Sequence, residues 1–385
     1  MPSLISRSIA TRAHTYEDFL RVKHFACLDG FRAVAVLMVM GWHARNGALS
    51  AANGNFGVTL FFVLSGFLIT TLAVREEMRS GAFQFIPFTI RRFFRIFPLL
   101  WLGVAAYAVL IFVLHLDPRA SEYARAIPFY LLYMGEWPIF TAPAQGMAGL
   151  GPAPFDGVWS LGIEEKFYIV WPILAFVILA RRRGRGLLAL TFAVSLWLFW
   201  QFADLSISIW VIHYAPIFLG CAAALFLHTR AGYAIIRHVT KPCVLYPVAL
   251  SLVVLIFFRL PPWGEAVKQL LVIGSLLGVV LEERGGISSF LSWAPLRRIG
   301  VISYGLYLFH ALVFKLVDKF LPPGNSVLLG LLTLAVGGTA AVLVCEVLHR
   351  FYERPLQDLG RRIAKRFSAS RDPAHRVPAM RPGPA

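Results

Sequence analysis

Two ionisable residues, Arg32 and His43, lie inside one apolar stretch of the sequence. Because ionisable groups are costly to bury in a hydrophobic span, each is a candidate functional residue. An α-helix turns by about 100° per residue, so their spacing brings both side chains to one helix face, about 16 Å apart along the axis. The two residues can therefore line one cavity. Alternatively, Arg32 extends to the cytoplasmic interface and His43 caps the outer end of the helix.

The composition predicts that a lipid bilayer surrounds these residues. Of the 385 residues, 58% are hydrophobic and 15% are charged, whereas soluble domains have roughly 45–50% apolar and about 25% charged residues. A content of 32 Phe, 10 Trp and 12 Tyr excludes a disordered chain despite the net charge of +17. A single soluble core could not bury so much apolar surface, so we expect an all-α, polytopic integral membrane protein.

About ten transmembrane helices are expected, because ten apolar runs are long enough to cross roughly 30 Å of hydrocarbon. The runs cover residues 26–46, 56–74, 97–116, 164–180, 187–203, 206–227, 243–258, 266–281, 299–318 and 326–349. A further stretch over residues 127–140 is shorter and contains Glu136 and Pro138. We therefore expect that segment to be re-entrant or interfacial.

The basic residues predict the orientation. With ten crossings and both termini inside, most of the 37 Lys and Arg residues lie in cytoplasmic segments, as the positive-inside rule requires. These segments are 1–25, 75–96, 181–186, 228–242, 282–298 and 350–385. Basic clusters between apolar runs are typical of membrane-protein loops and not of a nucleic-acid-binding surface. The N-terminus lacks an apolar region with a cleavage site, so we expect no cleaved signal peptide.

The predicted organisation has three parts. They are a cytoplasmic N-terminal segment over residues 1–25, a transmembrane domain over 26–355, and a basic, partly disordered cytoplasmic tail over 356–385. The sequence has no metal-ligand spacing and no Gly-x-Ser-x-Gly motif. It therefore supports neither a metalloenzyme nor a serine hydrolase.

Six motifs follow one another along the chain. They are LDGFR at 28–32 with the Arg-x10-His pattern that ends at His43, FFVLSGFLI at 61–69, RFFRIFP at 92–98, WSLGIEEKFY at 159–168, SYGLYLFH at 303–310, and YERP at 352–355. In this order, they resemble the acyltransferase-3 family of bacterial integral-membrane O-acyltransferases. Lys166 stands where family members more often have Gln. Many members add a periplasmic hydrolase-like domain, for which 385 residues leave no room, so we expect the membrane-only form.

The resemblance implies an activity and a location. Family members move acyl groups, commonly acetyl, from coenzyme A to hydroxyls of cell-surface carbohydrates and some small molecules. We therefore expect a bacterial inner-membrane protein with acyl-CoA as donor substrate and no permanently bound cofactor. Acyl-CoA is cytosolic and carries phosphates, so its site should be basic and face inward. Arg91, Arg92 and Arg95 would supply that charge, unless they only fix the topology, and Arg32 would steady the phosphates or the pantetheine arm.

The resemblance also implies roles for residues at the reacting groups. His43 would meet the thioester and act as a general base on the acceptor hydroxyl, or form an acyl-histidine intermediate. Glu164 or Glu165 would orient His43 or raise its basicity. In the alternative interpretation, one of these carboxylates pairs with Lys166 at the interface.

A polar stripe is expected on the ninth predicted helix, because Ser303, Tyr307 and His310 share one helix face. It would line the acceptor path, or its hydroxyls would pack against other helices. The expected acceptor is a glycan or lipid-linked sugar at the outer face. Two alternatives remain: acylation of a small natural product such as a macrolide, and transport of a solute or lipid, which an intramembrane Arg and His would also fit. The sequence does not predict the oligomeric state.

Overall fold

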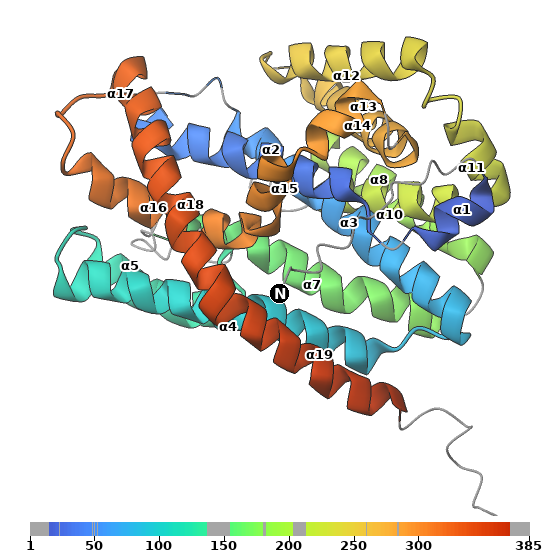
Figure 1. The fold of residues 1–385 in the computed structure, drawn as a ribbon, viewed down its shortest axis with the longest axis horizontal. Helices are drawn as coiled ribbons and strands as arrows, with labels where there is room; N and C mark the ends of the chain where they lie inside the picture. The colour runs from blue at the N-terminus through green and yellow to red at the C-terminus, as the bar shows by residue number, and fades with distance from the viewer. Residues whose placement is uncertain are drawn as a thin grey trace, which may run out of the picture.

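The computed structural model describes residues 15–22, 24–47, 49, 51, 53–136, 155–179, 182–202, 213–258, 260–282 and 285–369. Within these ranges every regular element is helical (Figure 1), which confirms the all-α class. Five helices are long and apolar enough to cross a membrane, or seven if each of two bent helix pairs counts as one crossing. The polytopic class is therefore confirmed, and the number of ten crossings stays a prediction.

The described helices run as follows. The first part of the chain holds α1 (Tyr16–Arg21), α2 (Ala26–His43), η1 (Ala44–Gly47), α3 (Gly54–Ser80), α4 (Phe85–Ala108), η3 (Val109–Val113), α5 (Ala120–Leu131), η4 (Asp156–Val158), α7 (Trp159–Pro172), η5 (Ile173–Ile178) and α8 (Arg182–Phe202). The second part holds α10 (Tyr214–Leu227), α11 (Arg230–Ile236), α12 (Pro242–Ile256), α13 (Pro262–Leu281), α14 (Gly286–Leu291), α15 (Ala294–Val301), α16 (Ser303–Asp318), α17 (Val327–Leu332), η6 (Thr333–Gly337), α18 (Gly338–Leu348), η7 (His349–Glu353) and α19 (Arg354–Ala369).

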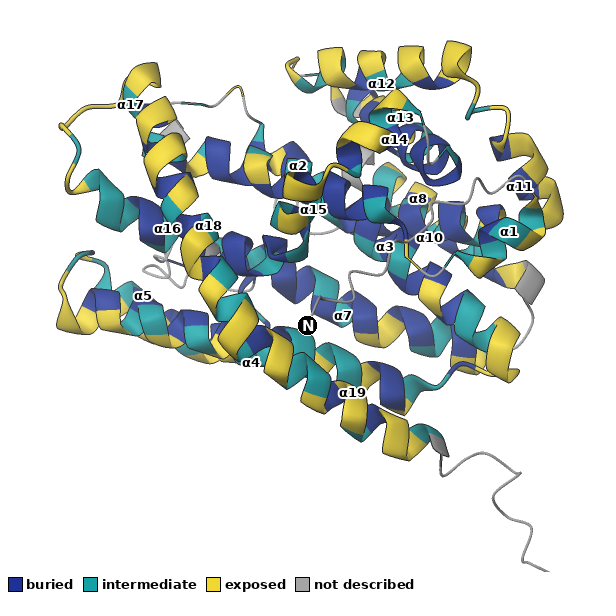
Figure 2. Cartoon of the chain, viewed as in Figure 1, coloured by how far each residue is buried: buried dark blue, intermediate teal, exposed yellow. Residues whose placement is uncertain are grey.

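The outside of the helix bundle is apolar. Figure 2 shows α12 and α17 largely exposed, and Leu250, Phe257, Leu328 and Leu343 are between 62% and 68% exposed. In water, so much exposed aliphatic and aromatic surface would be unfavourable. Hydrocarbon around the bundle removes that cost, in agreement with the membrane class.

Two glycines let α3 and α10 approach each other closely. A Cβ at Gly66 would lie 1.9 Å from the carbonyl oxygen of Ile217, and one at Gly220 would lie 2.3 Å from that of Val63. No larger residue fits at either position without separating the helices. This contact fixes the middle of α3, next to Ser65.

The third predicted span begins earlier than the hydropathy of residues 97–116 indicates. Helix α3 continues to Ser80 and α4 already begins at Phe85, so most of the predicted loop 75–96 is helical. Around the axis of α4, Arg95 lies between Arg91 and Arg92, which differ by about 100°. The hydropathy pattern places these three arginines outside the span, whereas the structure builds them into α4.

The ninth predicted span, 299–318, is two helices and not one. Helices α15 and α16 meet at an angle of 77°, and the break falls at Ile302, just before Ser303. Helix α15 crosses α2 in close contact, since a Cβ at Gly300 would lie 1.8 Å from the carbonyl oxygen of Asp29. The sixth predicted span is described only from His213 onward, and α10 is followed by α11 at 105°.

Two predicted segments lie partly outside the described residues. Helix α5 covers Ala120–Leu131, a length of about 18 Å that is too short to cross a bilayer. Residues 137–154 are outside the described ranges, so the re-entrant interpretation of 127–140 stays a prediction. The predicted tail over 356–385 begins as helix α19, which ends at Ala369 and packs along α4 (Figure 1).

The loop before α5 is tied to α16 by an ionic cluster. Asp117 accepts hydrogen bonds from the Arg119 guanidinium at 2.9 Å, and it also pairs with Lys315 of α16. Burial by itself would raise the pKa of Asp117, but the hydrogen bonds from Arg119 and Lys315 outweigh burial and hold that pKa below its ordinary value. The cluster joins the η3–α5 connection to the helix that carries His310.

Candidate active site

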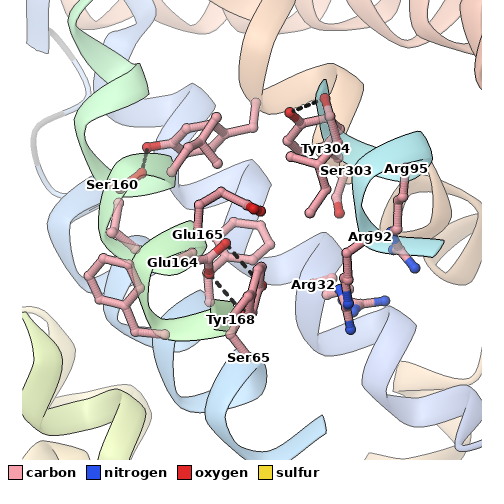
Figure 3. Close-up of a pocket in the computed structure, with 16 residues that line it drawn as sticks. Arg32, Ser65, Arg92, Arg95, Ser160, Glu164, Glu165, Tyr168, Ser303 and Tyr304 are labelled. Atoms are coloured by element: carbon pink, nitrogen blue, oxygen red, sulfur yellow. Dashed lines mark hydrogen bonds between the residues drawn. The ribbon is translucent and has the colours of Figure 1, made fainter. Parts of the chain in front are cut away.

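A cavity lies between α2, α3, α4, α7 and α16 (Figure 3). Its polar lining comes from all five helices. The polar and charged residues are Arg32, Ser65, Arg92, Arg95, Ser160, Glu164, Glu165, Tyr168, Ser303, Tyr304 and Tyr307. Most of the residues that the sequence predicts for the site therefore converge on one space.

Three arginines form one side of this cavity. Figure 3 shows Arg32 of α2 beside Arg92 and Arg95 of α4, across the cavity from the carboxylates. Arg32 lies 3.6 Å from Asp29, and the Arg92 guanidinium lies 4.9 Å from the centre of the Tyr168 ring. Among the described residues, neither Arg92 nor Arg95 has a carboxylate within ion-pair distance. This side of the cavity therefore carries excess positive charge.

Arg91 does not belong to that group. Its guanidinium lies 3.8 Å from Glu76 at the end of α3, and it does not line the cavity described above. One residue of an α-helix corresponds to a rotation of about 100°, which is enough to turn Arg91 away from Arg92. Of the three arginines predicted for the donor site on α4, only Arg92 and Arg95 therefore line this cavity.

Glu164 is held by hydroxyl groups on two helices. It accepts a hydrogen bond of 2.7 Å from Ser65 of α3 and one of 3.3 Å from Tyr168 of its own helix. The Ser65 and Tyr168 hydroxyls are also 2.9 Å apart. Glu165 is buried and lines the same cavity.

The two carboxylates line the cavity opposite Arg32, and neither shares a described hydrogen bond with His43. Helix α7 begins at Trp159, so Glu164 stands more than one turn inside the helix and not at the outer end of a span that starts at 164. The described hydrogen bonds of His43 go to other partners. The expectation that Glu164 or Glu165 orients His43 is therefore not met by this geometry.

Lys166 faces away from the cavity. Its ammonium group donates a 3.0 Å hydrogen bond to the carbonyl oxygen of Tyr133 and pairs with the fully buried Glu136. The alternative interpretation, in which Lys166 pairs with Glu164 or Glu165, also does not hold. Lys166 instead joins α7 to the segment that follows α5.

His43 is paired with a second histidine. Nε2 of His310 on α16 lies 3.2 Å from Nδ1 of His43, which is also 2.9 Å from the carbonyl oxygen of Val39. Nδ1 of His310 lies 2.8 Å from the carbonyl oxygen of Leu306, so it must carry a proton and leave Nε2 as an acceptor. His43 then holds its proton on Nδ1. Its Nε2 carries the lone pair, and the side chain is exposed at the end of α2.

The stripe on α16 connects the cavity with the histidine pair. Ser303 and Tyr307 line the cavity, and the Tyr307 hydroxyl lies 2.6 Å from the Ser160 hydroxyl. The next turn of the helix carries His310, whose ring centre is 6.3 Å from that of Tyr307. The residues of the predicted stripe therefore share one face, and its role as an acceptor path stays a prediction.

Comparison with known proteins identifies the family of this chain. Residues 25–350 match the family described as an acyltransferase domain, Acyl_transf_3. The chain belongs to the acyltransferase-3 family. The family match covers every helix that lines the cavity and contains the first five of the six motifs, which confirms the resemblance.

Curated relatives of this acyltransferase-family chain are named as O-acetyltransferases. It is 27% identical to peptidoglycan O-acetyltransferase OatA of Listeria monocytogenes over 88% of the chain and 56% of that protein. It is 28% identical to the putative peptidoglycan O-acetyltransferase YrhL of Bacillus subtilis, over 86% of the chain and 55% of YrhL. It is 26% identical to O-acetyltransferase OatA of Staphylococcus aureus, over 89% of the chain and 60% of that protein. The chain thus spans little more than half the length of these relatives. No solved structure matches it.

Several residues of the cavity in this acyltransferase were missed by reasoning from the sequence. Glu164 accepts hydrogen bonds from Ser65 and Tyr168, and the Ser160 hydroxyl bonds with that of Tyr307. Tyr304 donates a 2.9 Å hydrogen bond to the carbonyl oxygen of Ile96. Each lies inside one of the six motifs, where a hydroxyl interrupts an apolar run. That interruption is a usable signal, because hydroxyls in a membrane helix usually find a partner.

Proposed function

We propose that this protein is a membrane-bound O-acyltransferase that moves an acyl group, acetyl in the first instance, from acyl-CoA to a hydroxyl of a cell-surface or lipid-linked carbohydrate. The observation that carries the proposal is the pairing of two sites along α2. Arg32 stands in a cavity with Arg92 and Arg95, and His43 lies at the far end of the same helix beside His310. The arginine end suits a phosphorylated donor, and His43 at the other end suits the role of general base.

The arginine side of the cavity suits the donor. Guanidinium groups bind phosphate oxygens through two parallel N–H donors, and Arg92 and Arg95 have no ion pair among the described residues. A phosphate-bearing ligand would satisfy them, with its flexible arm extending past Tyr307 toward His43. The thioester would then meet the exposed imidazole, about 16 Å from Arg32 along the helix.

His43 would act as general base in the transfer. Its Nε2 takes the proton from the acceptor hydroxyl while the hydroxyl oxygen attacks the thioester carbonyl. The tetrahedral intermediate collapses by breaking the carbon–sulfur bond, and the departing CoA thiolate takes the proton back from His43. His310 holds the His43 proton on Nδ1 and so keeps Nε2 free. In the alternative route, Nε2 attacks the thioester, the carbon–sulfur bond breaks and the CoA thiolate leaves an acyl-histidine. The acceptor hydroxyl then takes the acyl group from Nε2, and its proton passes to the thiolate.

The names of the relatives suggest the acceptor class. Because they are called peptidoglycan O-acetyltransferases, we propose a carbohydrate acceptor and take peptidoglycan glycan as the first substrate to test. A small natural product is the alternative acceptor, and other hydroxyl compounds belong in the same assay.

We further propose that the protein lies in the bacterial inner membrane with both termini cytoplasmic. Basic residues from predicted cytoplasmic segments lie together, which supports this orientation. Arg185 of α8 pairs with Glu77 of α3 at 2.7 Å, and Arg91 of α4 lies beside Glu76. The ends of these helices therefore share one side of the bundle.

Release of CoA from purified protein tests the proposal. Detergent-solubilised protein is mixed with acetyl-CoA, with and without a peptidoglycan glycan, and both the free thiol and the acetylated glycan are measured. We expect acceptor-dependent thiol release, its loss in His43→Ala, and its retention in the matched control His238→Ala, because His238 is an exposed histidine far along the chain from the site. A transporter would bind the acceptor without releasing CoA, and that result would contradict the proposal.

A further inference from the structure

A second, strongly basic cavity adjoins the arginine side of the first. It shares Arg92 and Arg95 with the first cavity. We call it the basic groove. Its six cationic residues, set against the single carboxylate of Glu76, are Arg79, Arg91, Arg92, Arg95, Arg361 and Lys365. The residues that line the groove come from the end of α3, the start of α4 and α19.

One face of α19 forms the outer wall of the groove. Gln357, Arg361, Lys365 and Ser368 all line it, and their spacing of three or four residues brings them to one helix face. Helix α19 packs closely against α4 because Gly360 has no side chain. A Cβ at this position would be 2.6 Å from Cβ of Phe94. The wall is therefore held at a fixed distance from the arginines of α4.

The positive charges that line the basic groove are only partly neutralised within the protein. Arg91 lies 3.8 Å from Glu76, and Arg361 pairs with Asp358 on the solvent side of α19. Lys365 has no ion pair among the described residues and is exposed. Cations that surround a water-accessible space, with one carboxylate among them, attract a ligand that carries several negative charges.

We propose that the basic groove binds the phosphorylated nucleotide part of the acyl donor, clamped between α4 and α19. This inference rests on the proposed function, since it takes acyl-CoA as the donor. The nucleotide phosphates lie against Arg361, Lys365 and Arg91 and reach Arg92 and Arg95, which line both cavities. The pantetheine arm then continues into the first cavity. Helix α19 lies beyond the family match, which ends at residue 350, so this part of the chain adds a donor subsite.

The test compares two acetyl donors that differ only in the nucleotide. Acetyl-CoA carries the phosphorylated nucleotide, whereas acetylpantetheine has no phosphate. In the double variant Arg361→Gln/Lys365→Gln, we expect the KM for acetyl-CoA to rise about tenfold, because both contacts are exposed and individually weak. The KM for acetylpantetheine and both kcat values should stay unchanged. Retained activity with acetylpantetheine also shows that the variant is folded.

A matched control lies on the same helix. The double variant Arg362→Gln/Arg366→Gln removes the same charge from residues of α19 that do not line the groove, so its KM for acetyl-CoA should equal that of the unchanged protein. An equal rise in both double variants, or no rise in either, would overturn the assignment. If the unchanged protein used neither donor, the proposed function would fail instead.

Anionic lipid headgroups share the phosphate chemistry of the donor and are the other possible ligand source. The measurements are therefore repeated in nanodiscs of phosphatidylcholine alone and of phosphatidylcholine with phosphatidylglycerol. We expect the effect of Arg361→Gln/Lys365→Gln in both. An effect that appears only with phosphatidylglycerol would assign the groove to lipid and contradict the donor subsite.

Discussion

Removing the imidazole of His310 should slow acyl transfer modestly, and only through His43. His310 offers Nε2 to the Nδ1–H of His43 at 3.2 Å, at the long end of the hydrogen-bond range, and the carbonyl oxygen of Val39 offers a second acceptor at 2.9 Å. His310→Phe therefore removes one of two hydrogen bonds that fix the His43 tautomer. It keeps an aromatic ring, somewhat larger than imidazole, at a position where the side chain is only 3% exposed, so no cavity is left.

The size of the effect follows from the energy of one hydrogen bond. A net loss of about 0.5–1.5 kcal/mol corresponds to a decrease in kcat of roughly 2- to 12-fold. His43→Ala removes the base itself and should cost at least about 100-fold. Because His310 acts through His43, the double variant should be no slower than His43→Ala alone.

The assay is single-turnover acetyl transfer from acetyl-CoA to glycan in the four proteins of this cycle. CoA affinity, measured in parallel by calorimetry, should be the same in all four because neither histidine lines the arginine cavity. A loss in His310→Phe as large as that in His43→Ala would refute the reasoning, since His310 would then take part in the chemistry. Multiplicative losses in the double variant would also refute it.

Three further predictions address binding, stability and orientation. Arg32→Lys should weaken CoA binding nearly as much as Arg32→Ala, by at least about tenfold, because an ammonium group cannot bind phosphate in a bidentate manner; unchanged binding in calorimetry would contradict the donor site. The lowered pKa of Asp117 means that its carboxylate stabilises the fold above about pH 4 and that this contribution is lost as the pH falls through the lowered value. Asp117→Asn should therefore reduce the free energy of unfolding by about 1.5–3 kcal/mol at pH 7 and by less in acid, whereas an equal reduction at both pH values in thermal unfolding would exclude this explanation. In a Cys243→Ser background, which removes the exposed native thiol, a probe at Ala51→Cys should react in intact cells and one at Gly184→Cys only after permeabilisation; the reverse pattern would invert the proposed topology.

The family of this protein and much of its site could be predicted from local patterns. The spacing of Arg32 and His43 depends only on helix periodicity, so their common face follows from the sequence. The stripe of Ser303, Tyr307 and His310 follows in the same way. The apolar composition likewise requires a bilayer whatever the arrangement of the helices.

The partners of these residues depend on how the helices pack. The rotation and depth of α7 place Glu164 beside Ser65 instead of His43, and the docking of α16 makes His310 the neighbour of His43. The close contact of Gly360 with Phe94 brings the basic face of α19 to the arginines of α4. Hydrophobic periodicity defines which face of a helix is polar, but the distance between two polar faces on different helices is determined by side-chain packing across the whole bundle. The sequence alone therefore determined the membrane class and the polar helix faces, and only the tertiary structure decided which of those faces meet.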